Sequence, residues 1–215
     1  MTGSGDTKYT PQAVVFDCDG VLFDSRSANL AYYNCIFSHC GVAEVADDDE
    51  PLAELCHTAA TPEVLRCIVG EKLLPMALDF ARQLDYRQFI AQLCPESGLC
   101  ATLPRLAQRY LLAIATNRGA SMVDILEYFG LDKYFTQVIT YLDVERPKPQ
   151  PDMLLLAARR LGLTPAQLVF VGDSDLDRRA AQAAGCPFIA YGWDGGTRID
   201  CHSQLPTLLD EKFHS

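Results

Sequence analysis

Short apolar runs alternate with amphipathic stretches along most of the chain. Near-continuous apolar runs are typical of buried parallel strands, and the stretches between them have the three-to-four-residue spacing of helices. The pattern predicts helices over residues 121–129, 152–161 and 175–184, and strands over residues 12–16, 110–115, 137–141, 168–171 and 187–191. This alternation indicates an α/β fold with a Rossmann-like, doubly wound parallel sheet at its core.

The pattern changes between the first two predicted strands. From about residue 25 to 93 no strand pattern is present and helical periodicity dominates. One helix is expected to end at Gly41, another to start with Thr61 as N-cap before Pro62, and a third to span residues 71–93. The acidic run at 47–50 fits a solvated loop at the start of a helix.

The helical stretch is too long for a loop within a compact domain, so we expect a small inserted domain. The predicted division is a loose N-terminal tail over residues 1–10, a catalytic core over 11–23 and 95–215, and a helical cap over 24–94.

Composition narrows the function classes. The 215 residues include 28 acids and 18 bases, for a net charge of −10, which argues against nucleic-acid and anionic-membrane partners. No apolar run is long enough to span a membrane and the start lacks a signal-peptide pattern, so we expect a cytoplasmic enzyme.

The cysteines and histidines do not suggest a metal site. Nine cysteines without a C-x-x-C pair fit neither a disulfide framework nor zinc, and the four histidines lack ligand-like spacing. We expect reduced thiols that behave as small hydrophobes, notably Cys35, Cys56, Cys67, Cys94 and Cys186.

Two carboxylates follow the first predicted strand directly. Asp17 and Asp19 stand two positions apart, and a turn begins at Gly20. Two carboxylates at the end of a buried strand are costly unless a cation holds them, which favours a ligand site. A simple strand-to-turn cap at Asp19 is the alternative.

The carboxylates at 17 and 19 form the first of four motifs that follow predicted strands. The second motif offers a candidate anion site, and the third offers a cation. Thr116 and Asn117 end the second strand just before a helix, where they can bind an anion or serve as a plain N-cap. Lys148 stands among prolines at 147, 149 and 151, which predicts a stiff extended arm that opens a helix at Pro151. Such an arm can fix a point charge, or it can carry a solvated lysine.

The fourth motif follows the strand at 168–171. Asp173 is placed to bind a metal, whereas Ser174 and Asp177 resemble a helix-start capping box and Asp175 is expected to face solvent. Ligands of open parallel sheets bind beyond the carboxyl ends of the strands, where all four motifs lie. Oxygen ligands without His or Cys suit Mg²⁺, which together with Lys148 makes phosphate binding favourable.

This set of motifs resembles the haloacid dehalogenase superfamily, and most closely its phosphoglycolate phosphatase-like branch, through DCDGVLFDS, RPKPQPD and VGDSDLD. The resemblance implies a Mg²⁺-dependent phosphatase acting on a small phosphorylated metabolite, either phosphoglycolate-like or a sugar phosphate, through an aspartyl-phosphate. The resemblance implies that Asp17 is the nucleophile and Asp19 the general acid/base, and that Thr116, Asn117 and Lys148 bind the phosphate. It also implies that the metal is held by Asp17, Asp173 and the backbone carbonyl of Asp19. Asp177 and Ser174 would support this site.

The same residues favour some activities over others. Within the resemblance, an acid at Asp19 argues against carbon–halogen and phosphonate chemistry, whereas a phosphomutase of the β-phosphoglucomutase type stays open. A catalytically silent phospho-ligand binder and a phospho-receiver module fit less well, the latter because of the insert. Cap closure is expected to hinge near residues 23–25 and 95–98. Four basic residues of the insert could reach into the site but are expected to be solvated helix charges: Arg66, Lys72, Arg82 and Arg87. A monomer and a homodimer both remain open.

Overall fold

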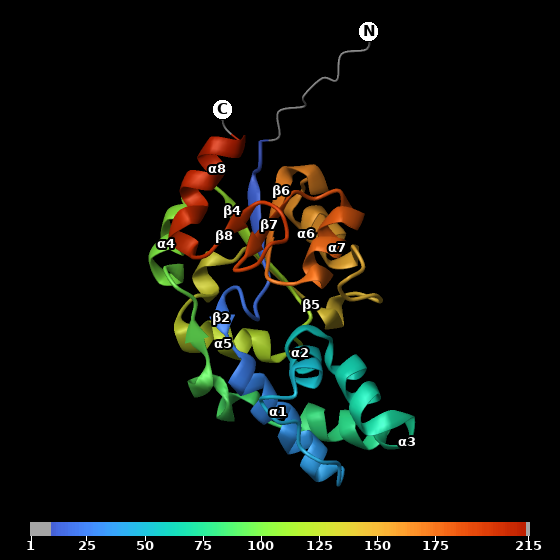
Figure 1. The fold of residues 1–215 in the computed structure, drawn as a ribbon. Helices are drawn as coiled ribbons and strands as arrows, with labels where there is room; N and C mark the ends of the chain where they lie inside the picture. Colours follow the sequence, from blue (N-terminus) through green and yellow to red (C-terminus); the bar gives the residue numbers. More distant parts are fainter. Residues whose placement is uncertain (1–9, 214–215) are drawn as a thin grey trace.

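A six-stranded parallel sheet forms the centre of the computed structural model, which describes residues 10–213 (Figure 1). The strand order is β5-β4-β1-β6-β7-β8, so the order reverses beside β1 as in a doubly wound fold. The strands are β1 (Ala13–Phe16), β4 (Leu111–Thr116), β5 (Gln137–Thr140), β6 (Leu168–Gly172), β7 (Phe188–Tyr191) and β8 (Arg198–Ile199). The predicted fold class is confirmed, and the five predicted strands agree with β1, β4, β5, β6 and β7 to within one residue at each end.

Side chains that alternate along the strands build a hydrophobic core on each face of the sheet. Val14 and Phe16 of β1 pack into the core beneath α4 (Leu99–Leu106), α5 (Ser121–Phe129) and α8 (Leu205–Phe213). Ala13 and Val15 pack on the opposite face, beneath α6 (Asp152–Leu161) and α7 (Asp175–Ala184). The helices predicted at 121–129, 152–161 and 175–184 are therefore confirmed.

Most of the segment between β1 and β4, residues 26–92, forms a helical layer at one end of the sheet (Figure 1). It contains α1 (Arg26–His39), α2 (Glu50–Thr58), α3 (Thr61–Gln83) and 3₁₀ turns at Tyr86–Gln88 and Ile90–Gln92. Its own hydrophobic cluster includes Phe37 and Leu65. The antiparallel pair β2 (Phe23–Asp24) and β3 (Cys94–Pro95) connects this layer to the sheet.

The helix predicted over 71–93 is right at its start and wrong at its end. α3 runs from Thr61 to Gln83, but the non-helical backbone at Gly70 (φ 77°, ψ 165°) divides it, so that a second helical stretch begins at residue 71. Apolar residues beyond Gln83 continue the pattern but lie in 3₁₀ turns packed on the core. The N-cap is Ala60 rather than Thr61, whose hydroxyl lies 3.1 Å from that of Tyr33. The expected helix-start acid is confirmed, because Asp49 caps α2.

The proline-rich arm is bent rather than extended. The Lys148–Pro149 peptide is cis, and the Gln150 N–H donates to the Pro147 carbonyl at 2.9 Å, which closes a turn. Pro151 caps α6 at its predicted start.

All nine cysteines are free. Cys56 and Cys186 are buried as expected, whereas Cys35, Cys67 and Cys94 are exposed, so the small-hydrophobe interpretation is wrong for these three. Within residues 10–213, no helix has both the length and the hydrophobicity needed to cross a membrane.

Candidate active site

The predicted acids and the predicted lysine lie together at the carboxyl edge of the sheet. Asp17 follows β1 and Asp173 follows β6, which are hydrogen-bonded neighbours. The Lys148 ammonium lies 2.8 Å from Asp17 Oδ1 and 2.7 Å from Asp177 Oδ1, with a side chain only 2% exposed. A buried cation therefore bridges two motifs that are 160 residues apart in sequence (17 and 177).

Asp177 is held on both of its oxygens. Its Oδ2 accepts from the Ser174 hydroxyl at 2.5 Å and from the Ser174 N–H at 3.2 Å, while Oδ1 accepts from Lys148. The Ser174 hydroxyl in turn caps the first turn of α7, so the predicted capping box is confirmed. Asp175 is exposed, as expected.

Two glycines allow the close approach of these loops. A Cβ on Gly20, whose φ is +69°, would lie 1.9 Å from Asp173 Oδ2. A Cβ on Gly172 would lie 2.4 Å from that of Asp177. The site therefore depends on the absence of side chains at both positions.

Three carboxylates form a compact acidic cluster. Asp17, Asp173 and Asp177 each offer an oxygen within 4.8 Å of the others. Burial raises the pKa of Asp17 to about 7, with Lys148 lowering it and the neighbouring carboxylates raising it further. Burial likewise raises the pKa of Asp173. Crowded hard oxygen donors of this kind fit a divalent cation such as Mg²⁺.

Asp19 occupies a different environment. The Arg118 guanidinium binds both of its oxygens, and Oδ1 also accepts from the Ser25 hydroxyl at 2.5 Å and the Asn29 amide at 2.9 Å. Burial opposes ionisation, but Arg118, His57 and the Ser25 hydroxyl together outweigh it and hold the pKa of Asp19 at about 2. The carboxyl of Asp19 is therefore ionised in this arrangement.

Arg118 was not predicted as a site residue. It joins the sheet to the helical layer, donating to the side-chain amide oxygen of Asn29 (Oδ1) at 2.6 Å and lying over the Tyr86 ring at 4.7 Å. Its position directly after Thr116 and Asn117 is the only sequence signal, since its partners are distant in the chain.

Thr116 and Asn117 lie at the expected strand end and are buried. The Thr116 hydroxyl accepts from the Arg118 N–H at 3.1 Å. The Asn117 side chain accepts from the Lys148 N–H at 3.0 Å and donates to the Lys148 carbonyl at 3.2 Å and the Thr58 carbonyl at 3.0 Å. Asn117 thus positions the Lys148 loop and α2, while phosphate binding by Thr116, Asn117 and Lys148 stays a prediction.

His57 was also missed by sequence reasoning. Its Nε2 lies 3.7 Å from Asp173 Oδ2. Burial would lower the pKa of His57, but Asp173 and Asp19 raise it above its ordinary value. A single histidine in α2 has no spacing that marks it.

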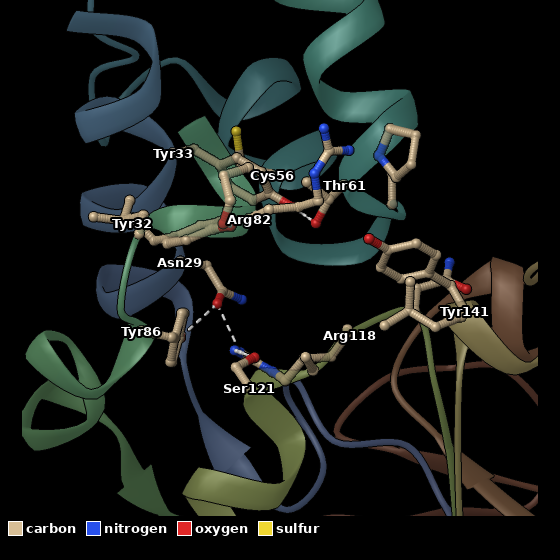
Figure 2. A pocket seen from close by; sticks show the side chains of 18 of the residues that line it. Asn29, Tyr32, Tyr33, Cys56, Thr61, Arg82, Tyr86, Arg118, Ser121 and Tyr141 are labelled. Carbon is tan, nitrogen blue, oxygen red and sulfur yellow. Dashed lines mark hydrogen bonds between the residues drawn. The ribbon is translucent and has the colours of Figure 1, made fainter. Parts of the chain in front are cut away.

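A cavity of about 630 Å³ separates the helical layer from the core loops (Figure 2). Asp19 and Asn117 lie on its wall, and Arg82 also lines it. Arg66 and Arg87 instead form exposed pairs with Glu71 and Asp85, and Lys72 is exposed, as expected for solvated charges.

The sequence is similar to a known family of hydrolases and to individual phosphatases. The sequence profile of the haloacid dehalogenase-like hydrolase family matches residues 14–191. Phosphoglycolate phosphatase of Escherichia coli O157:H7 is 47% identical over 214 residues, which cover 88% of this chain and 85% of that protein. Phosphoglycolate phosphatase of Salmonella paratyphi A is 47% identical over 228 residues, covering 94% and 90% respectively.

Solved structures of other proteins share the fold of this chain. A haloacid dehalogenase-superfamily hydrolase from Geobacter sulfurreducens PCA is 36% identical, with a TM-score of 0.81 and coverage of 93% of this chain and 100% of that one. A β-phosphoglucomutase from Clostridium difficile also has a TM-score of 0.81 over 95% and 98% of the chains, but at 17% identity it shows the fold alone. The resemblance seen in the motifs is confirmed, and the chain belongs to the haloacid dehalogenase-like hydrolase family.

Proposed function

We propose that the protein is a Mg²⁺-dependent phosphatase that hydrolyses a small phosphorylated metabolite through an aspartyl-phosphate at Asp17. The observation that carries the proposal is the meeting of Asp17, Lys148 and Asp173 at one strand edge, with Asp19 beside a cavity. The named relatives are phosphoglycolate phosphatases, which supports phosphate monoester hydrolysis here.

The residues of the chain divide the work. An Asp17 oxygen forms a bond to phosphorus as the bond to the leaving oxygen breaks, and a proton from Asp19 neutralises that oxygen. Water then attacks phosphorus, giving its proton to Asp19 and releasing phosphate and the free Asp17 carboxylate. The ionised Asp19 described above is the form that accepts the proton of water in the second step. To act as the acid of the first step, Asp19 must first take up a proton against the effect of Arg118.

Asp17, Asp173 and the carbonyl of Asp19 would hold the metal, with Asp177 as a supporting acid. When bound, Mg²⁺ supplies positive charge that offsets the crowded carboxylates and favours a phosphate dianion. Lys148 contributes a fixed positive charge beside the nucleophile, and Asn117 and Asp177 position its loop and ammonium.

Residues 24–94 would serve as the cap. Asn117 contacts Thr58, and Arg118 contacts Asn29 and Tyr86, so these residues link the proposed cap to the core next to Asp19. Closure would exclude bulk water from the reaction. Hinges near residues 23–25 and 95–98, cytoplasmic location and a monomeric or homodimeric state stay predictions.

Phosphate release from a panel of phosphorylated metabolites, with Mg²⁺ or with EDTA, tests the proposal. We expect release that requires Mg²⁺ and is abolished by Asp17→Asn, with circular dichroism unchanged. An active Asp17→Asn protein would contradict the mechanism. Transfer of labelled phosphate between positions of a sugar, rather than to water, would instead support the phosphomutase alternative.

A further inference from the structure

The cavity is much larger than a two-carbon leaving group requires. Its volume of about 630 Å³ lies in the range of about 300–1,000 Å³ that accommodates drug-sized ligands. The space is present while Thr58, Asn29 and Tyr86 of the helical layer contact core residues, so it does not result from separation of the two parts. The leaving group can therefore be substantial.

Aromatic rings form much of the wall. Tyr32, Tyr33 and Tyr86 line one side and Tyr141 the other (Figure 2). The rings of Tyr32 and Tyr33 lie 5.2 Å apart and those of Tyr32 and Tyr86 lie 5.3 Å apart, at angles typical of favourable aromatic contact. The Tyr86 hydroxyl donates to Asn29 at 2.9 Å and that of Tyr33 pairs with Thr61. Tyr32 and Tyr141 are half-buried and present ring surface from two sides of the cavity, whereas Tyr33 and Tyr86 are each only 6% exposed.

Cations that line the cavity already face carboxylates. The pairs are Arg118 with Asp19, His57 with Asp173, and Arg82 with Asp79. Asp85 and Asp124 add negative charge to the lining. A second anionic group on the substrate would thus meet no unpaired cation among the described lining residues, whereas an uncharged apolar group needs no such partner.

We infer that the physiological substrate is the phosphate monoester of an uncharged aromatic alcohol, bound with its ring between Tyr32 and Tyr141. The phosphate would lie beside Asp17, two residues from Asp19 on the cavity wall, and the ring would lie in the cavity. This inference rests on the proposed function, and it narrows the substrate class of the same site.

Three esters of primary alcohols test it, since the bond that breaks is the same in each. The esters are 2-naphthylmethyl phosphate, glucose 6-phosphate and phosphoglycolate, assayed by phosphate release with Mg²⁺. We expect kcat/KM for the naphthylmethyl ester to exceed the other two at least tenfold. Equal values, or a preference for glucose 6-phosphate or phosphoglycolate, would overturn the inference while leaving the phosphatase proposal standing.

Substitutions of Tyr141 test whether its ring causes the preference for the naphthylmethyl ester. Tyr141→Ala should reduce the naphthylmethyl-to-phosphoglycolate ratio at least fivefold, whereas Tyr141→Phe, which keeps the ring, should retain it. Tyr128→Ala, at a residue 63% exposed and outside the cavity, is the matched control and should leave kcat/KM unchanged. A full preference in Tyr141→Ala would overturn the proposed ring contact. Phosphate release from none of the esters, or release that persists in EDTA or in Asp17→Asn, would contradict the proposed function, and the inference with it.

Discussion

Replacing Lys148 with Met removes the cation that separates two buried carboxylates. The Lys148 side chain is 2% exposed and its partners Asp17 and Asp177 are 10% and 0% exposed, so solvent cannot take its place. Methionine fills a similar volume, which isolates the charge from packing. Breaking a buried ion pair by removing one partner costs about 3–5 kcal/mol.

The expected loss depends on pH. Since burial raises the pKa of Asp17 from its ordinary 3.8 to about 7, the unfolded chain releases this proton first, and the native protein loses stability as pH rises from about 4 to 7 and loses no more from this group above 7. Lys148 reduces this cost, and its removal raises the pKa of Asp17 further. The difference between wild type and variant should therefore be smallest near pH 5 and grow by up to about 1.4 kcal/mol per pH unit above 7.

Thermal unfolding followed by circular dichroism, without Mg²⁺, measures this effect. At about 2–4 °C per kcal/mol for a chain of this size, Tm should fall by about 6–20 °C near neutral pH. Lys72→Met, on an exposed helix position, is the control and should change stability by less than about 0.5 kcal/mol. A Tm loss that is the same at pH 5 and pH 8 would refute the reasoning.

Three further substitutions probe the same edge of the sheet. Gly20→Ala should abolish phosphate release while the far-ultraviolet spectrum is retained, because its Cβ would collide with Asp173; an active variant would contradict the proposed packing. Arg118→Met removes the main cation that depresses the pKa of Asp19, so Asp19 keeps the proton that it donates to the leaving oxygen up to a higher pH, and the basic limb of the kcat/KM pH profile should move to higher pH; an unmoved limb would contradict Asp19 as the general acid. Ser174→Ala removes the α7 cap and should cost about 1 kcal/mol in urea unfolding, and an unchanged midpoint would argue against the cap's contribution.

The core could be predicted from sequence because its strands are buried on both faces. Such strands read as continuous apolar runs, and helices between them end at glycines such as Gly130 and Gly185 in the left-handed region. β8, with two residues, is too short for a pattern. The end of α3 was missed because apolar residues after Gln83 continue the helical spacing while packing as 3₁₀ turns.

The acids of the site were predictable because each follows a strand, and parallel strands bring their ends to one edge. Arg118 and His57 were not, because their importance lies in partners that only the folded chain brings near: Asn29 and Tyr86 for Arg118, and Asp173 for His57. The bend at Lys148 was missed because prolines restrict the residues before them but do not reveal a cis bond.

The stereochemical course at phosphorus tests the covalent mechanism most directly. An isotopically chiral thiophosphate ester would be hydrolysed in isotopically labelled water with Mg²⁺, and the configuration of the released thiophosphate determined. Attack by Asp17 followed by attack of water inverts phosphorus twice, so we predict net retention, with no release by Asp17→Asn. Net inversion would mean a single attack by water and would contradict an aspartyl-phosphate at Asp17.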